Sequence, residues 1–449
     1  MKLYLIVETA DARGGFLELE GRHWGLDVFE LDEKSTPHLS FLCISYTWGL
    51  GREPSPFHAG FDVSDRTIPA LRSAIRMRPH FTKIWIDAFC VPQDAQERYS
   101  CLESMGFIYS QADEVVVVLS PAAQPVIRAM ADTKQLDNHD LPILEKEAWV
   151  TRAWTYQEAI NSRSLSFTSE GASGTPIAAT GFLNCVGHAL NRLQLAPLER
   201  RSTWPGLEAF EDLFDYLTSV YEERSALQIM GDMDRRTQLR PEDHFYAMMG
   251  AVSRIPASSS GTSDACEAFM RLCERKGDYS FIYSAAPRCS EPGRRWRPLS
   301  GHLPAVLQWQ CGGGGQPGSV EEDGLVLSQL VTMEQGPATE AAKAFVFRWF
   351  QSLRCGEECR WADLPARILG ALRLMGFTGG DAFWELPGGL FFTTSVPKSV
   401  GSFVVSASLG WRFGAPGLAL SSGGSAISYN PGVFVGIVDQ STASHVKLV

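Results

Sequence analysis

The sequence lacks long apolar runs and any excess of positive charge. Its longest unbroken apolar runs, such as residues 115–119, have only the length of a strand, whereas about 20 residues are needed to span a bilayer. The 449 residues include 40 Lys and Arg against 51 Asp and Glu, for a net charge of −11. This balance argues against broad electrostatic binding to nucleic acid or anionic lipid, although it leaves room for a local basic pocket. We therefore expect no membrane span and no nucleic-acid partner.

Several sequence signatures of known chemistry are also missing. The ten cysteines include no Cys-x-x-Cys pair and no spacing with histidine that is typical of zinc sites, so we expect reduced thiols and no metal. The Gly-x-Ser-x-Gly turn of hydrolases and the Gly-Lys-Ser/Thr phosphate loop are both absent. Residues 1–7 start like a signal peptide, but Glu8 and Asp11 follow at once and no apolar core develops, so we expect no secretory signal and a cytoplasmic protein.

Strand and helix patterns alternate between residues 40 and 170. We predict strands at 41–46, 83–89 and 114–119, with helices over 67–78 and 97–112 between them and Thr67 as the cap of the first helix. Further helices are expected over 122–131 and 141–160, before a last strand at 165–167. Nearly continuous apolar strands are typical of a parallel sheet that is covered on both faces. The fold class predicted here is α/β, with an open, mostly parallel sheet flanked by helices.

The rest of the chain changes character twice. Apolar and aromatic residues recur at helical spacing between residues 200 and 290, which predicts a mainly helical region. Residues 376–449 carry few charges, and runs such as 390–395 and 402–409 are β-like and are separated by Gly, Pro and Ser. We therefore expect an N-terminal segment at 1–39, an α/β domain at 40–170, a mainly helical region at 171–290 and a β-rich region of unknown role at 291–449.

Three short segments of the α/β region stand out together. They read LCISYTWG at 42–49, IWIDAFCVPQD at 84–94 and RAWTYQE at 152–158. In their order, spacing and residue types they resemble the fungal heterokaryon-incompatibility (HET) domain. The pattern of that family is Leu-Ser-Tyr-x-Trp-Gly, then Trp-Ile-Asp-x-x-Cys-Ile-Asn-Gln-Asp, then Arg-x-Trp-Thr-x-Gln-Glu. The resemblance covers roughly residues 40–165, and a further similar segment ends near residue 250. Val91-Pro92 departs from the family's Ile-Asn, and the proline removes a backbone N–H just after the strand.

The resemblance implies a role in non-self recognition and programmed cell death, a form of innate immunity in filamentous fungi. HET domains are themselves similar to Toll/interleukin-receptor (TIR) domains, which share an open, flavodoxin-like parallel sheet. Some TIR domains cleave NAD with a glutamate that lies four residues after a tryptophan, and Trp154 and Glu158 have that spacing. The resemblance thus implies an NAD glycohydrolase (NADase) with Glu158 as the catalytic residue, and NAD as a substrate with no separate cofactor.

Simple physical chemistry agrees with such a site. Residues four apart share one face of a helix, and cleavage of the nicotinamide–ribose bond passes through an oxocarbenium-like state that a carboxylate stabilises. Ligands of open α/β sheets bind beyond the carboxyl ends of the strands, where two of the three segments end. A Gly-x-Gly turn there would allow a phosphate to approach the backbone. The expected substrate-binding residues are Trp48, Gly49, Gly51, Asp87 and Trp154.

Each of these residues also has a purely structural interpretation. Glu158 could be a surface carboxylate paired with Arg152 or Arg163, the tryptophans could be core residues, and Asp87 could cap a turn. The corresponding alternative for the whole protein is a non-enzymatic signalling adaptor whose HET domain binds another copy or a partner, and a third is an inactive HET-like protein. The enzyme and the adaptor both predict association through the HET domain and a protein trigger or partner that the sequence does not identify.

Overall fold

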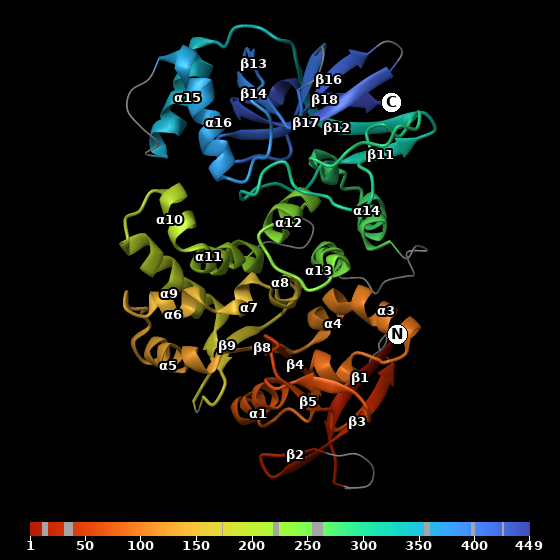
Figure 1. Ribbon diagram of the computed structural model, residues 1–449, viewed down its shortest axis with the longest axis vertical. Helices are drawn as coiled ribbons and strands as arrows, with labels where there is room; N and C mark the ends of the chain where they lie inside the picture. Colours follow the sequence, from red (N-terminus) through yellow and green to blue (C-terminus); the bar gives the residue numbers. More distant parts are fainter. Residues whose placement is uncertain are drawn as a thin grey trace. The chain divides into compact units, whose positions relative to one another are not determined.

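The chain forms two compact units in the computed structural model (Figure 1). The structure describes residues 1–10, 17–30, 39–172, 174–218, 224–253, 264–353, 360–396, 400–423 and 426–449. The first unit comprises Met1–Leu195, Arg200–Thr218 and Thr237–Ser259, and the second comprises Ala196–Glu199, Ser219–Arg236 and Ser260–Val449. Each unit is built around its own sheet.

The first unit contains an eight-stranded sheet in the order β10-β9-β8-β4-β7-β1-β3-β2. Its strands are β1 (Lys2–Glu8), β2 (Leu17–Leu19), β3 (Arg22–Glu30), β4 (Leu42–Tyr46), β7 (Lys83–Trp85), β8 (Glu114–Leu119), β9 (Leu165–Ser169) and β10 (Ile177–Ala178). The central pairs β9–β8, β8–β4 and β4–β7 are parallel, and the outer pairs are antiparallel. All residues of β4 and β9 are buried, as expected for strands that are covered on both faces. The predicted α/β class with a parallel central sheet is confirmed.

The strands β1, β2 and β3, which lie within the N-terminal segment predicted at 1–39, belong to this same sheet. β1 pairs with β7 on one side and with β3 on the other. Leu3 and Leu5 of β1 are buried and alternate with more exposed residues. This period of two is the pattern of a half-buried strand.

Helices connect the parallel strands and cover the sheet. They are α1 (Thr67–Met77), α2 (Asp87–Cys90), α3 (Ala95–Glu103), α4 (Met105–Gln111), α5 (Gln124–Thr133), α6 (Leu141–Glu145), α7 (Ala148–Thr151), α8 (Ala153–Ile160), α9 (Ala179–Arg192), α11 (Pro205–Thr218) and α13 (Pro241–Val252). The residues of α10 (Pro197–Thr203) are divided between the first and the second unit. α1 contacts β4, β8 and β9, while α8 contacts β4, and α13 packs on both α4 and α8. Figure 1 shows α1 on one side of these strands and α4 and α8 on the other.

Three predicted elements are divided differently in the structure. The strand predicted at 83–89 ends at Trp85, because Asp87 begins the short helix α2. The helix predicted over 97–112 is interrupted at Ser104, whose backbone leaves the helical range. The helix predicted over 141–160 is three helices, and Arg152 between α7 and α8 is extended with φ −86° and ψ 143°. Local periodicity predicted these helical segments but not the points at which tertiary contacts break them.

Thr67 is not the cap of α1, contrary to the sequence prediction. Arg66 occupies the cap position, and Thr67 is already the first helical residue. The Thr67 hydroxyl instead lies 2.7 Å from the Tyr46 hydroxyl, in a buried hydrogen bond. This contact ties the start of α1 to the end of β4.

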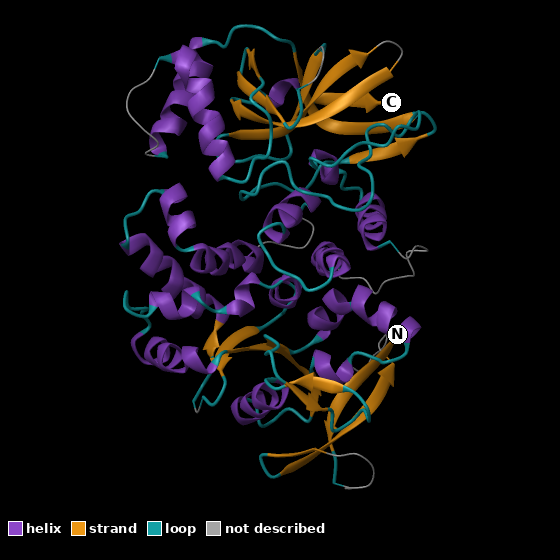
Figure 2. Ribbon diagram, in the orientation of Figure 1, coloured by secondary structure: helices purple, strands orange, loops and turns teal. Residues whose placement is uncertain are grey.

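The second unit contains an antiparallel sheet in the order β11-β12-β15-β16-β17-β14-β13, with β18 also paired to β12 (Figure 2). Its strands are β11 (Gly318–Glu321), β12 (Gly324–Met333), β13 (Phe383–Leu386), β14 (Gly389–Thr393), β15 (Ser402–Ser406), β16 (Gly414–Gly423), β17 (Ala426–Gly436) and β18 (Ser444–Leu448). The predicted β-rich character of the last third is confirmed. A cluster of buried apolar residues that includes Phe391, Phe403 and Phe434 forms part of its core.

The second unit also contains helices within the region predicted as β-rich. Its helices are α12 (Ala226–Met233), α14 (Ala265–Lys276), α15 (Glu340–Ser352) and α16 (Leu364–Leu374). The last two lie in the region 291–449 that was predicted to be β-rich. α15 packs against β14 and β17, and its Trp349 stacks on Phe413 with ring centres 4.4 Å apart. The low charge of residues 376–449 favoured strands, and the amphipathic segments before them were not recognised as helices.

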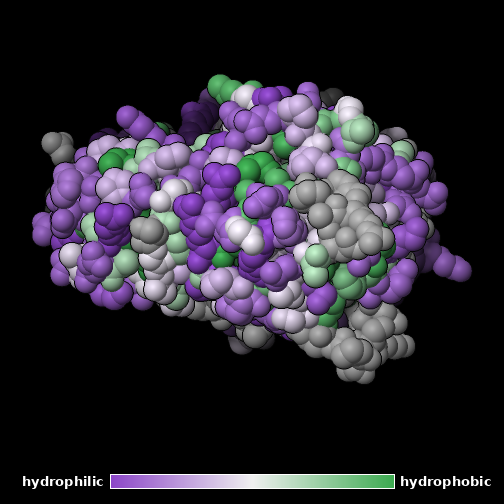
Figure 3. Space-filling model, turned by 90° about the horizontal axis from the view of Figure 1, so that it is seen from below, coloured by the Kyte–Doolittle hydropathy of each residue, from purple (hydrophilic) through white to green (hydrophobic). Residues whose placement is uncertain are grey.

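The surface carries scattered apolar groups among polar ones. The face seen in Figure 3 is mostly hydrophilic, with hydrophobic side chains in small patches. Such isolated groups are ordinary on protein surfaces. Within the described residues, no helix has both the length and the apolar character required to cross a membrane.

Candidate functional site

Glu158 lies in a buried cluster of polar side chains between α8, β4 and α4. The residue is only 5% exposed, and its carboxylate accepts a hydrogen bond from the Ser45 hydroxyl. The Trp149 indole N–H in turn donates to Ser45 Oγ at 2.7 Å, so the serine hydroxyl hydrogen is left to point at Glu158. Tyr109 of α4 also hydrogen-bonds to the carboxylate. Glu158 is therefore held by hydrogen-bond partners from two other elements, β4 and α4.

The position of α8 is fixed by the junction that precedes it. The Thr155 hydroxyl donates to the carbonyl oxygens of Trp149, at 2.5 Å, and of Arg152, at 2.9 Å. The Ala153 N–H donates to the Thr237 carbonyl at 3.0 Å, beside the extended Arg152. These bonds satisfy backbone groups at the start of a short helix and aim its middle, with Glu158, at the sheet.

Asp87 lies at the end of β7 and joins the same cluster. Its carboxylate accepts hydrogen bonds from the Trp48 indole N–H at 2.8 Å and from the Ala88 N–H at 2.7 Å. Trp48 is partly exposed, and the Arg52 guanidinium lies over its ring, 5.6 Å from the ring centre. The structure thus brings together Trp48, Asp87 and Glu158, three of the residues singled out from the sequence.

Burial dominates the electrostatics of the two carboxylates. Desolvation raises the pKa of Glu158 to about 8; the Ser45 hydrogen bond opposes this shift, the charge of Asp87 adds to it, and Arg152 and Tyr109 oppose it. Burial also raises the pKa of Asp87, against the hydrogen bonds from Trp48 and Ala88 and the charge of Arg152. Glu158 is therefore mostly protonated and neutral at pH 7. Two acids and a partly exposed arginine in one place are the kind of arrangement that enzymes use to tune proton affinity.

The backbone N–H groups of the two glycines in the first motif donate hydrogen bonds to side chains of the protein itself. The Gly49 N–H donates to Ser64 Oγ at 2.7 Å, and the Gly51 N–H donates to Asp65 Oδ2 at 3.2 Å. A methyl group added at either glycine would lie within 2.4 Å of an Asp65 carboxylate oxygen. Glycine is thus needed here for the approach of a carboxylate, and the expected contact with a substrate phosphate stays a prediction.

Trp154 makes its ring contact and its side-chain hydrogen bond with residues of α13. Its ring stacks on Tyr246 of α13, with the ring planes 9° apart and the centres 6.4 Å apart, and its side chain hydrogen-bonds to Asp243. Although Trp154 and Glu158 lie four residues apart on one helix, their side chains contact different partners. Its predicted role as a wall of the substrate site stays a prediction.

The nearby cysteines are not activated nucleophiles. Cys43 and Cys90 are buried, and burial raises the pKa of Cys90 to about 12 and that of Cys43 well above its usual range. Both thiols are therefore protonated at neutral pH, which disfavours nucleophilic or metal-binding roles.

Several members of the cluster were not identified from the sequence. Ser45 and Tyr46 stand inside the quoted motifs, so their positions could have been read there, and Arg152 was considered only as a surface ion-pair partner of Glu158. Tyr109 belongs to the helix between the second and third motifs. Trp149 carries no sequence signal, because only the fold brings its indole 2.7 Å from Ser45.

One cavity of the first unit lies apart from this cluster. It has a volume of about 660 Å³, and α5, α9 and the end of β9 line it with residues that include Arg128, Thr168, Cys185 and His188. None of the predicted site residues lines it. The Glu158 cluster is thus a packed polar site and not part of this cavity.

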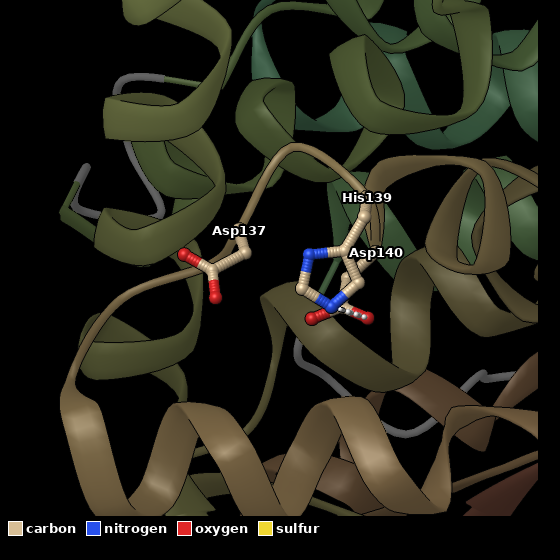
Figure 4. Close-up of side chains that lie close together, drawn as sticks. All are labelled: Asp137, His139 and Asp140. Atoms are coloured by element: carbon tan, nitrogen blue, oxygen red, sulfur yellow. Dashed lines mark ion pairs between the residues drawn. The ribbon is translucent and has the colours of Figure 1, made fainter.

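A group of potential metal ligands occurs on the loop before α6. Asp137, His139 and Asp140 place their ligand atoms within 4.8 Å of one another, and the His139 and Asp140 side chains lie 3.4 Å apart (Figure 4). Asp137 and His139 are exposed. Exposed neighbours of this kind, all within four residues of chain, do not by themselves form a metal site.

The Asp87→Asn variant is expected to lower the free energy of unfolding by about 1–2 kcal/mol. The amide keeps one acceptor, so either the Trp48 indole N–H or the Ala88 N–H loses its partner. Urea unfolding followed by tryptophan fluorescence measures the loss. Asp62→Asn, which makes the same change at an exposed position of β6 (Asp62–Ser64), should leave the midpoint unchanged. Equal stability of the two variants would contradict a structural role for these bonds.

Comparison with known proteins identifies part of this region. No curated protein and no solved structure matched the chain. Residues 41–143 match the family model described as Heterokaryon incompatibility protein (HET). The matched segment contains the first two motifs, with Trp48 and Asp87, and ends before α8. The chain therefore contains a heterokaryon incompatibility (HET) domain.

Proposed function

We propose that this protein is a HET-type effector of non-self recognition and programmed cell death, and that it hydrolyses the nicotinamide–ribose bond of NAD. The observation that carries the proposal is the meeting of Glu158, Asp87 and Arg152 at the ends of the central parallel strands. This is the edge of an α/β sheet at which ligands bind. All three residues come from the motifs that resemble the family.

The chemistry needs few groups. Departure of nicotinamide leaves positive charge on the ribose, and water then adds to C1′ and loses a proton, giving ADP-ribose and free nicotinamide. A Glu158 carboxylate beside the ribose stabilises that charge or orients the ribose hydroxyls. Asp87 and the Trp48 indole, which are hydrogen-bonded to each other, would then contact the ribose and the planar nicotinamide ring.

The burial of Glu158 supports a site that is closed at rest. With its pKa raised to about 8 by burial, the group is neutral at pH 7 and cannot stabilise a cation. Entry of water or substrate would lower that pKa and produce the carboxylate. Assembly of HET domains is a suitable trigger, and it would place the active protein in an oligomer that forms after a partner is recognised.

The same burial also favours a second candidate, the non-enzymatic adaptor. Glu158 is hydrogen-bonded to Ser45 and Tyr109, as a structural residue of a polar core would be. In that case α8 only supports the fold, and the HET domain acts as a binding surface. The two candidates differ in whether Glu158 is needed for turnover.

The Glu158→Gln variant tests the enzyme directly. Purified protein at high concentration is incubated with NAD at pH 7.5, and released nicotinamide is measured by chromatography. We expect turnover by the wild type and a loss of at least 100-fold in the variant, because the amide cannot carry the compensating charge. The matched control is Glu18→Gln, the same change at an exposed position of β2, which should retain full activity.

Two results would overturn the enzymatic proposal. Equal turnover by Glu158→Gln and the wild type would remove Glu158 from the mechanism. Absence of turnover in wild-type protein that light scattering shows to be oligomeric would favour the adaptor. Thermal unfolding at pH 5.5 confirms in each case that the variant is folded.

A further inference from the structure

We propose that the second unit contains a binding site for a small molecule that carries two or more phosphate groups. The site is a cavity of about 510 Å³ beside α14, within the range of small-molecule sites. Arg271, Arg275, Arg294 and Arg297 line it, together with Glu267 and Glu274. The cavity therefore carries a local charge of +2 in a chain whose net charge is −11.

The charged side chains that line the cavity differ in whether they form ion pairs. Arg297 bonds to both glutamates, with Nη1 2.8 Å from Glu267 and Nε 2.8 Å from Glu274. Arg271 Nε also lies 2.8 Å from Glu267. These ion pairs use both acidic groups of the lining. Among the described residues, the Arg275 and Arg294 side chains have no ion-pair partner and are exposed.

The ion pairs give the cavity a fixed frame. The Arg297 side chain is 14% exposed and is held in place by its two partners. Burial alone would raise the pKa of Glu267, but the hydrogen bonds from Arg297 and Arg271 outweigh it and leave that pKa below its usual value. Glu267 therefore stays ionised and keeps Arg297 in position, while Arg275 and Arg294 remain available to a ligand.

The element that presents these groups is a regular helix. Asp264 caps α14 by accepting the Glu267 N–H at 3.1 Å, and the spacing of four residues puts Glu267, Arg271 and Arg275 on one face. Arg294 and Arg297 come from a separate segment that follows a turn at Gly293 with φ +75°. Two free guanidinium groups that face one cavity suit an anion with several acceptor oxygens, because the planar fork of arginine matches phosphate geometry.

Apolar residues complete the lining. Trp296 and Tyr279 are 2% and 4% exposed, and their rings pack edge to face with centres 6.0 Å apart. The Trp296 indole N–H donates a hydrogen bond to the Gly293 carbonyl oxygen at 3.0 Å. The aromatic residues therefore form a rigid wall without free polar atoms, and the arginines supply the recognition. The size of the cavity favours a small phosphorylated molecule over nucleic acid.

The experiment measures binding of inorganic diphosphate to the full chain by isothermal titration calorimetry in 50 mM salt. We expect binding that weakens at least tenfold in Arg275→Ala and in Arg294→Ala. Arg348→Ala is the matched control, because it removes an exposed arginine of α15 outside the cavity; its affinity should equal that of the wild type. Binding should also weaken when the salt is raised to 200 mM, and inorganic monophosphate should bind at least tenfold more weakly than diphosphate.

The proposal fails if diphosphate does not bind the wild type, if both cavity variants bind it as tightly as the wild type does, or if monophosphate binds equally well. Thermal unfolding of each variant shows that it is folded; because Arg275 and Arg294 are exposed and have no ion-pair partner, little change is expected. The result is independent of the proposed NAD hydrolysis, since Glu158→Gln should bind diphosphate as the wild type does. Failure of one proposal therefore leaves the other standing.

Discussion

The Glu158→Gln variant is expected to be more stable than the wild type at pH 8.5, by about 4 kcal/mol. Burial raises the pKa of Glu158 from 4.5 to about 8. Between these two pH values the folded protein holds a proton that the unfolded chain has released. The free energy of unfolding of the wild type therefore falls as the pH rises through this window, by up to about 1.4 kcal/mol per pH unit. A glutamine does not titrate, so the variant loses this contribution to the pH dependence.

The two proteins should be nearly equally stable at pH 5, where Glu158 is protonated in the folded protein and an amide of similar shape replaces the acid. Urea unfolding at pH 5, 6, 7, 8 and 8.5 measures the difference between them, and subtraction removes the contributions of other buried acids such as Asp234, whose pKa burial also raises. Glu18→Gln should follow the wild type at every pH. A constant difference across the whole range would mean that Glu158 is not held in a desolvated site.

The sequence predicted the framework around this site well. The strands at β4 and β8 and the helices after them followed from apolar periodicity. The motifs correctly indicated that Asp87 and Trp48 lie at strand ends. These features are local, because they depend on the chain within one or two turns of the residue.

The environment of Glu158 was not predictable in the same way. Helical spacing suggested that it shares a cleft with Trp154, but the structure gives it Ser45 and Tyr109 as partners. Those partners lie 113 and 49 positions away in the chain, and only the packing of α8 on β4 and on α4 brings them together. Whether a helix residue faces solvent, a cleft or a polar core depends on such distant contacts.

The packing of α4, which forms the second part of the helix predicted over 97–112, also depends on a distant contact. α4 begins again at Met105, and its second residue, Gly106, lies against Gly250 of α13. Two glycines that meet from positions 144 residues apart leave no local pattern. The close approach of these helices is therefore a property of the tertiary structure that the sequence does not reveal.

The Gly106→Ala variant is expected to lower the free energy of unfolding by about 3 kcal/mol. A methyl group on Gly106 would lie 2.3 Å from the Gly250 carbonyl oxygen and 2.6 Å from its Cα. Both atoms belong to the backbone of α13, so the helices must separate and not merely change a rotamer. α8 would be affected as well, because Asn161, the residue at its C-cap position, donates from Nδ2 to the same Gly250 carbonyl at 2.6 Å.

Gly181→Ala is the matched control, since Gly181 lies in α9 of the same unit and a methyl group there would meet only the Ile177 side chain, at 3.6 Å. Alanine favours helix over glycine, so this variant should be equal to the wild type or slightly more stable. Urea unfolding of the two variants separates the intrinsic preference of the helix from the close packing of α4 on α13. A loss below about 0.5 kcal/mol in Gly106→Ala would show that α13 can move away at little cost. In that case the packing behind Glu158 would be loose, and the closed polar site that both candidate functions share would lose its support.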